Sequence, residues 1–109
     1  MREIRYIFLF VMLNLFQHLN AQQNKIDSLL TLLKTDKEDT NKVKHLNALS
    51  VQYRLIGEYD RGLTYGKQSL ELAHSLNFKR GLATSYNSVG IIYDNLGNLP
   101  DALTSFFPP

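Results

Sequence analysis

The side chains in this sequence that could carry chemistry are few and widely spaced. The chain has three histidines and no cysteine, which excludes disulfides and thiol catalysis. His45 and His74 lack a second ligand at the spacing of a metal site, so we interpret both as exposed helix residues. No base is paired with a serine in a nucleophile motif. These residues indicate neither an enzyme nor a metal site.

A second candidate is the charged segment "TDKEDTNK", in which Asp36, Glu38 and Asp39 alternate with lysines. Clustered carboxylates can bind a metal or act as acid and base. Here the two signs of charge alternate without apolar shielding, which favours a solvated connector. The stretch "GLATSYNSVG" has neither the lysine nor the glycine spacing of a phosphate-binding loop. The sequence therefore predicts no cofactor.

Composition limits the partners of the chain. It has 109 residues, enough for one small domain, with 12 basic and 10 acidic side chains and a formal net charge of +2. A near-neutral chain gives no electrostatic case for binding nucleic acid or an anionic membrane surface.

The N-terminal segment has the layout of a secretory signal peptide. A basic start, "MREIR", is followed by the apolar run "YIFLFVMLNLF" and the polar exit "QHLNAQQN". This predicts a signal at 1–21, cleaved after Ala21, and an exported protein that is periplasmic or membrane-associated. The apolar run is shorter than the roughly 20 residues of a spanning helix. An uncleaved membrane anchor and a buried amphipathic helix remain the alternatives.

An internal repeat organises the rest of the chain. Sliding the sequence by 40 positions places 43–67 on 83–107 and matches large apolar residues with large ones and small with small. The identical pairs are Asn47 with Asn87, Tyr53 with Tyr93, Gly57 with Gly97, Leu63 with Leu103, and Thr64 with Thr104. Two copies of one structural unit are predicted.

Each copy has the pattern of a helix, a tight turn and an antiparallel helix. The first helix of copy one has an apolar face at three- and four-residue spacing, formed by Leu46, Leu49, Tyr53 and Ile56. Gly57 and Gly97 fall where a left-handed residue closes a helix. Asn98 can then cap the next helix, and Pro100 lies in its first turn. The predicted class is all-α.

Small residues lie where the two helices of a unit are expected to meet. Ser50 and Gly90 occupy matched positions in the first helices, and Gly62 and Ala102 do so in the second helices. Helices approach closely only where side chains are short. Close packing would therefore offset the cost of Gly90 inside a helix, about 1 kcal/mol relative to alanine.

This arrangement resembles the tetratricopeptide repeat. The residues that carry the resemblance are Leu46, Leu49, Ser50, Tyr53, Gly57, Tyr59 and Gly62, and then Tyr86, Val89, Gly90, Tyr93, Gly97, Leu99, Ala102 and Phe106. Copy one departs from the family at Gly62 and Gly66, and the period of 40 exceeds the usual 34. It is similar to the longer variant of bacterial signalling proteins, and the resemblance implies a short right-handed α-solenoid.

The predicted organisation has five parts. A signal peptide at 1–21 precedes a capping helix at 22–35, in which Ile26, Leu29, Leu30 and Leu33 form the apolar side. A charged linker at 36–42, repeat 1 at 43–82 and a truncated repeat 2 at 83–109 follow. The prolines at 108 and 109 would end the last helix and leave Phe106 and Phe107 little to pack against. We interpret the chain as a fragment of a longer array, or as a miniature that self-associates through its C-terminal end.

The resemblance also implies a concave peptide-binding groove lined by the first helix of each repeat. Its residues would be Lys44, Asn47, Val51, Arg54, Thr84, Asn87, Ile91 and Asp94. Asn47 and Asn87 can pair with an extended peptide backbone through both a donor and an acceptor. Ordinary solvent-facing polar residues are the alternative for both. The predicted function is an exported, non-catalytic peptide- or protein-binding module. The alternatives are the N-terminal sensory segment of a sensor histidine kinase or related regulator, and a fragment without a stable fold.

Overall fold

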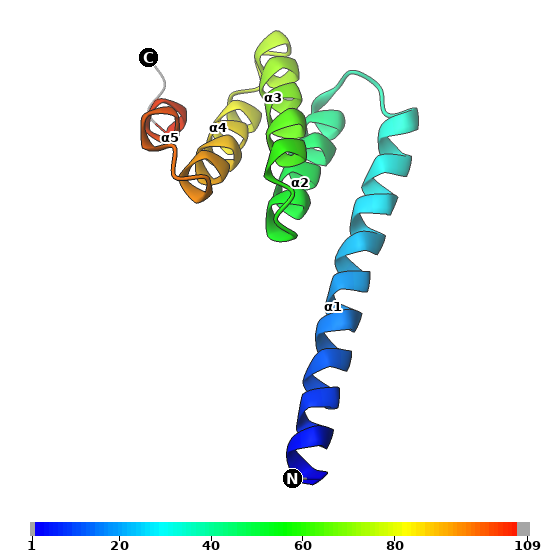
Figure 1. Cartoon of the computed structure of the whole chain (residues 1–109). Coiled ribbons are helices and arrows are strands. Elements are labelled where there is room, and N and C mark those ends of the chain that lie inside the picture. Colours follow the sequence, from blue (N-terminus) through cyan, green and yellow to red (C-terminus); the bar gives the residue numbers. More distant parts are fainter. Residues whose placement is uncertain (1, 107–109) are drawn as a thin grey trace.

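The computed structural model describes residues 2–106, and every regular element in that range is an α-helix. Figure 1 shows the long first helix beside a group of four shorter ones. The helices are α1 (Arg2–Thr35), α2 (Thr40–Leu55), α3 (Tyr59–Ser75), α4 (Lys79–Asn95) and α5 (Leu99–Phe106). The all-α prediction is confirmed. α2 begins at Thr40, three residues before the predicted start of repeat 1, so the connector after α1 is shorter than predicted.

The three turns that connect the successive helices from α2 to α5 share one geometry. Gly57 has a φ of 81° and Gly97 a φ of 73°, in the left-handed region that both were predicted to occupy. After each glycine, the next backbone amide bonds back to a carbonyl of the helix, from Glu58 to Tyr53 and from Asn98 to Tyr93, both at 2.8 Å. The turn from α3 to α4 uses the same device with Asn77, whose φ is 53°. The chain therefore reverses at 20-residue intervals.

Successive helices run in opposite directions and pack against one another (Figure 1). α2 packs on α3, α3 on α4 and α4 on α5, while α2 also contacts α4 and α1 lies against α2. The first helices of the two sequence repeats, α2 and α4, are thus neighbours. This adjacency creates the surface described below.

The core lies mainly between α1, α2 and α3. Ile26, Leu49 and Tyr53 are buried together, and Leu29, Leu30, Leu33, Ile56 and Tyr65 pack around them. The rings of Tyr53 and Tyr65 stack with centroids 5.5 Å apart. The C-terminal part of α1 therefore covers α2 with the apolar side predicted for a capping helix.

Small residues do lie where helices approach most closely. The Ser50 hydroxyl donates a 2.8 Å bond to the Gly62 carbonyl, so α2 and α3 meet almost backbone to backbone. Gly90 lies within an unbroken α4, where a Cβ atom would meet the Phe106 ring at 2.8 Å. The Phe106 ring therefore packs over Gly90, which the prediction did not foresee, although the side chain remains 38% exposed. Phe107, Pro108 and Pro109 lie outside the described residues.

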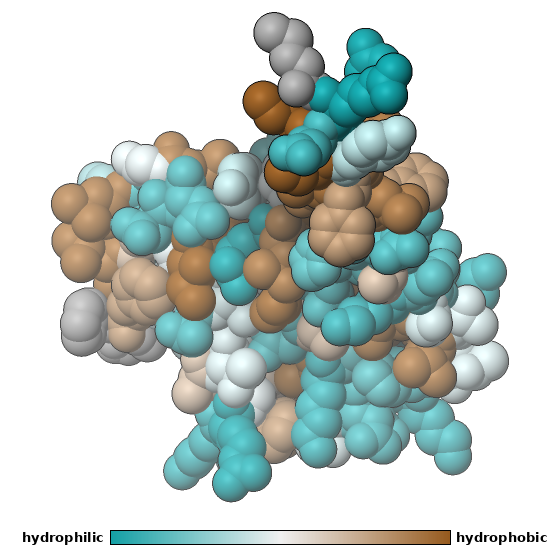
Figure 2. Space-filling model, turned by 90° about the horizontal axis from the view of Figure 1, so that it is seen from below, coloured by the Kyte–Doolittle hydropathy of each residue, from teal (hydrophilic) through white to brown (hydrophobic). Residues whose placement is uncertain are grey.

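The first half of α1 projects from the other helices (Figure 1). Its large apolar side chains between Ile4 and Leu19 are about half exposed or more, and Figure 2 shows apolar side chains on this projecting part. α1 continues without a break past Ala21, the predicted cleavage site. Within residues 2–106, no helix is both long and apolar enough to span a membrane.

Candidate binding groove

A hollow of about 360 Å³ lies between α2 and α4. α2 and α4 form its two walls, and Phe78, the N-cap residue of α4, also lines it. The lining residues are Val43, Lys44, Asn47, Ala48 and Val51 from α2, and Phe78, Arg80, Gly81, Thr84 and Ser88 from the turn and α4. Its volume falls in the lower part of the range of ligand pockets.

The position of Phe78 depends on Gly81. A Cβ atom at Gly81 would lie 2.4 Å from the Phe78 ring and 2.9 Å from Val43, so only glycine leaves room for the ring at this place. Ser69 of α3 ties the helices together beneath the hollow. Its hydroxyl donates to the Val43 carbonyl at 3.1 Å and lies 2.7 Å from the Ser85 hydroxyl of α4. These buried bonds fix the spacing of the two walls.

Asn47 and Ser88 are the buried polar side chains among the residues that line the hollow, and Asn47 is the one with an unpaired atom. It is only 6% exposed, and its Oδ1 atom has no hydrogen-bond partner among the residues described. A buried polar atom without a partner costs roughly 1–3 kcal/mol. Asn47 lines the hollow, and a side-chain amide of this kind can pair with a ligand amide through both a donor and an acceptor.

A second hollow, of about 460 Å³, continues this surface across α2 to α1. Asn24, Lys25, Ser28 and Leu29 of α1 line it together with Ala48 and Gln52 of α2. Ala48 is common to both hollows, so they meet on one face of α2. Gln52 resembles Asn47, because its side-chain Oε1 atom is also buried and has no hydrogen-bond partner within residues 2–106. We call the two hollows together the groove.

The eight predicted groove residues are divided by the structure. Lys44, Asn47, Val51 and Thr84 line the hollow between α2 and α4, whereas Arg54, Asn87, Ile91 and Asp94 do not. Asn87 instead lines a smaller hollow of about 300 Å³ near α5, with Ala83, Tyr86, Ser105 and Phe106. The matched asparagines therefore face different neighbours.

Stacking explains this division. Neighbouring helices of a repeat array meet through opposite edges, the far edge of one against the near edge of the next. Asn47 lines the hollow between α2 and α4, whereas Asn87 lines the next hollow along the stack, near α5. The division is partial, because two matched pairs, Lys44 with Thr84 and Ala48 with Ser88, do line the hollow between α2 and α4 together. Phe78, Arg80 and Gly81 were missed because they precede residue 83, where repeat 2 was predicted to begin.

The charged connector has local structural roles. Asp39 caps α2 by accepting bonds from the amides of Asn41 and Lys42 at 3.0 and 3.2 Å. The Asp36 carboxylate lies 2.6 Å from the Nδ1 atom of His45, and both side chains are largely buried. The prediction that His45 is exposed is therefore wrong, because the connector folds back over the first turns of α2. His74 is exposed, as predicted.

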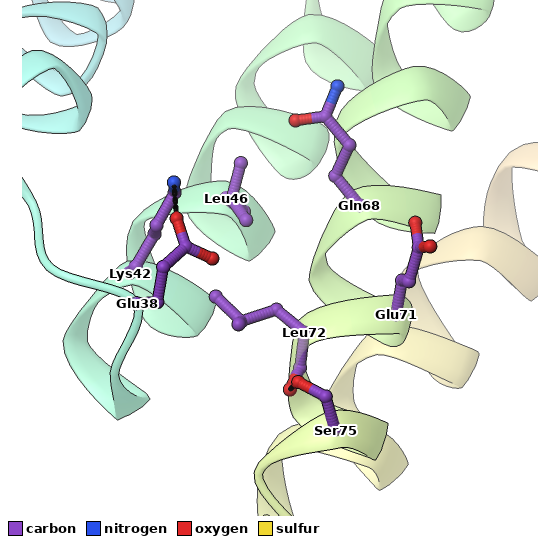
Figure 3. A pocket seen from close by; sticks show the side chains of 7 residues that line it. All are labelled: Glu38, Lys42, Leu46, Gln68, Glu71, Leu72 and Ser75. Carbon is purple, nitrogen blue, oxygen red and sulfur yellow. Dashed lines mark hydrogen bonds and ion pairs between the residues drawn. The ribbon is translucent and has the colours of Figure 1, made fainter.

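Another hollow, of about 380 Å³, lies between the connector, α2 and α3. Figure 3 shows Glu38, Lys42 and Leu46 on one side and Gln68, Glu71, Leu72 and Ser75 on the other. Lys42 forms an ion pair with Glu38 on the same side of this hollow, so these two charges neutralise each other. Among residues 2–106, no three histidine or carboxylate side chains come together as a metal-ligand group.

Comparison with known proteins adds no identity. No family model, no curated protein and no solved structure matches this chain. The groove is therefore the feature that indicates a function for this chain.

Proposed function

We propose that this protein is a non-catalytic peptide- or protein-binding module, with the groove as its binding surface. The observation that carries the proposal is the hollow between α2 and α4, in which the buried Asn47 amide lies beside apolar side chains. A peptide can place a side chain in such a hollow and satisfy the amide with its backbone.

We further propose that the helices form a short right-handed solenoid of the tetratricopeptide type. The equivalent glycine turns after α2 and α4, the contact between α2 and α4, and the small residues at helix crossings support this architecture. In such arrays, the first helices of successive units line a concave surface. The sensory-segment alternative places the same groove in a signalling protein and leaves its binding role unchanged.

The proposal is tested by selecting peptides from a random display library on the immobilised full chain. Peptides that bind the wild type should lose at least about tenfold in affinity for Ala48→Trp, because the indole fills the place where the two hollows meet. Thr64→Trp on the exposed face of α3 is the matched control and should retain binding. Equal binding to wild type and Ala48→Trp, with both variants helical by circular dichroism, would move the binding site away from the groove.

We also propose that residues 1–21 direct export. The support is the exposed apolar side chains of the first half of α1, which make no buried contact with α2 to α5. In a Gram-negative host that expresses the full chain, the exported product should begin at Gln22, as read by N-terminal sequencing. A product that keeps residues 1–21 in the membrane fraction would favour the uncleaved-anchor alternative.

A further inference from the structure

The charges around the groove are all of one sign. Lys25 lines the hollow beside α1, and Lys44 and Arg80 line the hollow between α2 and α4. No carboxylate is among the residues that line either hollow, although the chain has 10 acidic side chains. The charged residues that line the groove are therefore all cationic, which the overall charge of +2 does not predict.

Apolar side chains lie between these cations. Val43, Ala48, Val51 and Phe78 line the hollow between α2 and α4, to which Lys44 and Arg80 also contribute. A ligand that fits this pattern has an apolar side chain for the hollow and negative charges on both sides of it. The buried amide oxygens of Asn47 and Gln52 add a need for backbone N–H donors.

A peptide fits these features better than a nucleic acid. Nucleic-acid surfaces combine many phosphate contacts with aromatic platforms on which bases stack. The groove has three cationic residues and one aromatic side chain, Phe78. Three cations suit a few carboxylates, and the apolar lining has no use in binding a phosphate backbone.

We propose that the groove binds an acidic, extended segment of a partner protein in which an apolar residue lies between acidic residues. This inference rests on the proposed function and names its ligand class. The acidic side chains pair with Lys44 and Arg80 at the hollow between α2 and α4 and with Lys25 at the hollow beside α1. The bound segment crosses α1, α2 and α4, so α1 contributes to binding in addition to covering α2.

The test uses a fluorescent peptide with blocked termini, in which one leucine lies between two pairs of glutamates on a glycine–serine background. Anisotropy titrations of the full chain compare it with a glutamine analogue, a lysine analogue, a leucine-to-serine analogue and single-stranded oligothymidylate. We expect the glutamate peptide to bind at least about tenfold more tightly than the glutamine analogue at low salt, and more weakly as salt rises. The serine analogue should also bind more weakly, because it leaves the apolar hollow unfilled.

Charge reversal makes the test specific. The double variant K44E/R80E should lose about tenfold or more for the glutamate peptide and gain affinity for the lysine analogue. K34E/K37E has the same net charge change at two exposed lysines outside the groove and should leave both affinities within about twofold. Circular dichroism checks that all variants stay helical.

The outcomes separate this inference from the proposed function. If library-selected peptides are lost on Ala48→Trp but are not acidic, or if K44E/R80E binds them as the wild type does, the groove is a binding site and the charge inference is overturned. Equal or tighter binding of oligothymidylate would also overturn it. If no peptide from the library binds at all, both proposals are overturned.

Discussion

Gly66 lies where α2, α3 and α4 meet, and its replacement by alanine tests the packing of all three. A Cβ atom there would lie 2.8 Å from Cγ2 of Val89 and 3.0 Å from Oγ of Ser50. Both neighbours are buried, and Ser50 is held by its bond to the Gly62 carbonyl. The valine is branched at Cβ and has little rotamer freedom in a helix. Neither contact can relax cheaply.

Two effects of the Gly66→Ala change oppose each other. Alanine in a helix interior is favoured over glycine by about 1 kcal/mol. Overpacking of a tight core costs about 1–3 kcal/mol. Because the facing atoms are fixed, we expect the packing cost to exceed the helix propensity and the variant to lose up to about 2 kcal/mol of unfolding free energy. For a domain of this size, about 1 kcal/mol lowers Tm by about 4–8 °C.

The matched control is Gly90→Ala. An added Cβ there also meets a side chain at 2.8 Å, but that side chain is Phe106, which is 38% exposed in the last described turn of α5. Its ring can move toward solvent, so the propensity gain should offset most of the cost. We therefore expect Gly90→Ala to be more stable than Gly66→Ala by about 1–2 kcal/mol in urea unfolding followed by circular dichroism.

A double-mutant cycle identifies the responsible contact. Val89→Ala alone should cost about 2 kcal/mol, because two buried methyl groups are lost. In that background the clash at Cγ2 is absent and only the 3.0 Å approach to Ser50 remains, so Gly66→Ala should cost much less than in the wild type, and the coupling should reach about 1–2 kcal/mol. If Gly66→Ala is at least as stable as the wild type and its coupling to Val89→Ala is zero, the close approach of the three helices does not explain this glycine.

Two further predictions concern the cap of α2 and the buried tyrosine. Asp39→Ala should lower the unfolding free energy by about 1 kcal/mol, because two backbone amides of α2 lose their acceptor. The control is Glu58→Ala before α3, which should change the unfolding free energy little because the Glu58 side chain makes no capping bond. Equal urea midpoints for the two variants would contradict this prediction. Burial raises the pKa of Tyr53 above its ordinary value of 10, the nearby Tyr65 adds to the rise, and Arg61 opposes it. Because the pKa of Tyr53 is higher in the folded than in the unfolded state, the contribution of Tyr53 to the unfolding free energy is fully present below about pH 10. This contribution is lost as the pH rises through the folded pKa. From pH 9 to pH 11, the unfolding free energy measured in urea should therefore fall more for the wild type than for Tyr53→Phe. Equal decreases would exclude Tyr53 as the source of the pH dependence.

Local rules were sufficient to predict much of the fold. The apolar spacing of Leu46, Leu49 and Tyr53 and the glycine turns at Gly57 and Gly97 specify helices that reverse direction, because they act within a few residues of chain. The left-handed geometry of Asn77 was not predicted, since asparagine occupies this region less often than glycine and is a weaker signal for it. The contact of His45 with Asp36 was also missed, because it depends on how the connector folds back.

The pattern of apolar, small and turn-forming residues along the chain specifies the helices, most of their turns and the small residues where the helices cross. The set of residues that shares the groove depends instead on how the helices pack. Lys44 and Arg80 belong to different helices and do not occupy matched positions of the repeat, yet both line one hollow because α2 packs beside α4. Asn47 and Asn87 are matched in sequence, yet they line different hollows, one between α2 and α4 and the other near α5. A repeat specifies what each unit presents on each edge, whereas stacking determines which edges meet.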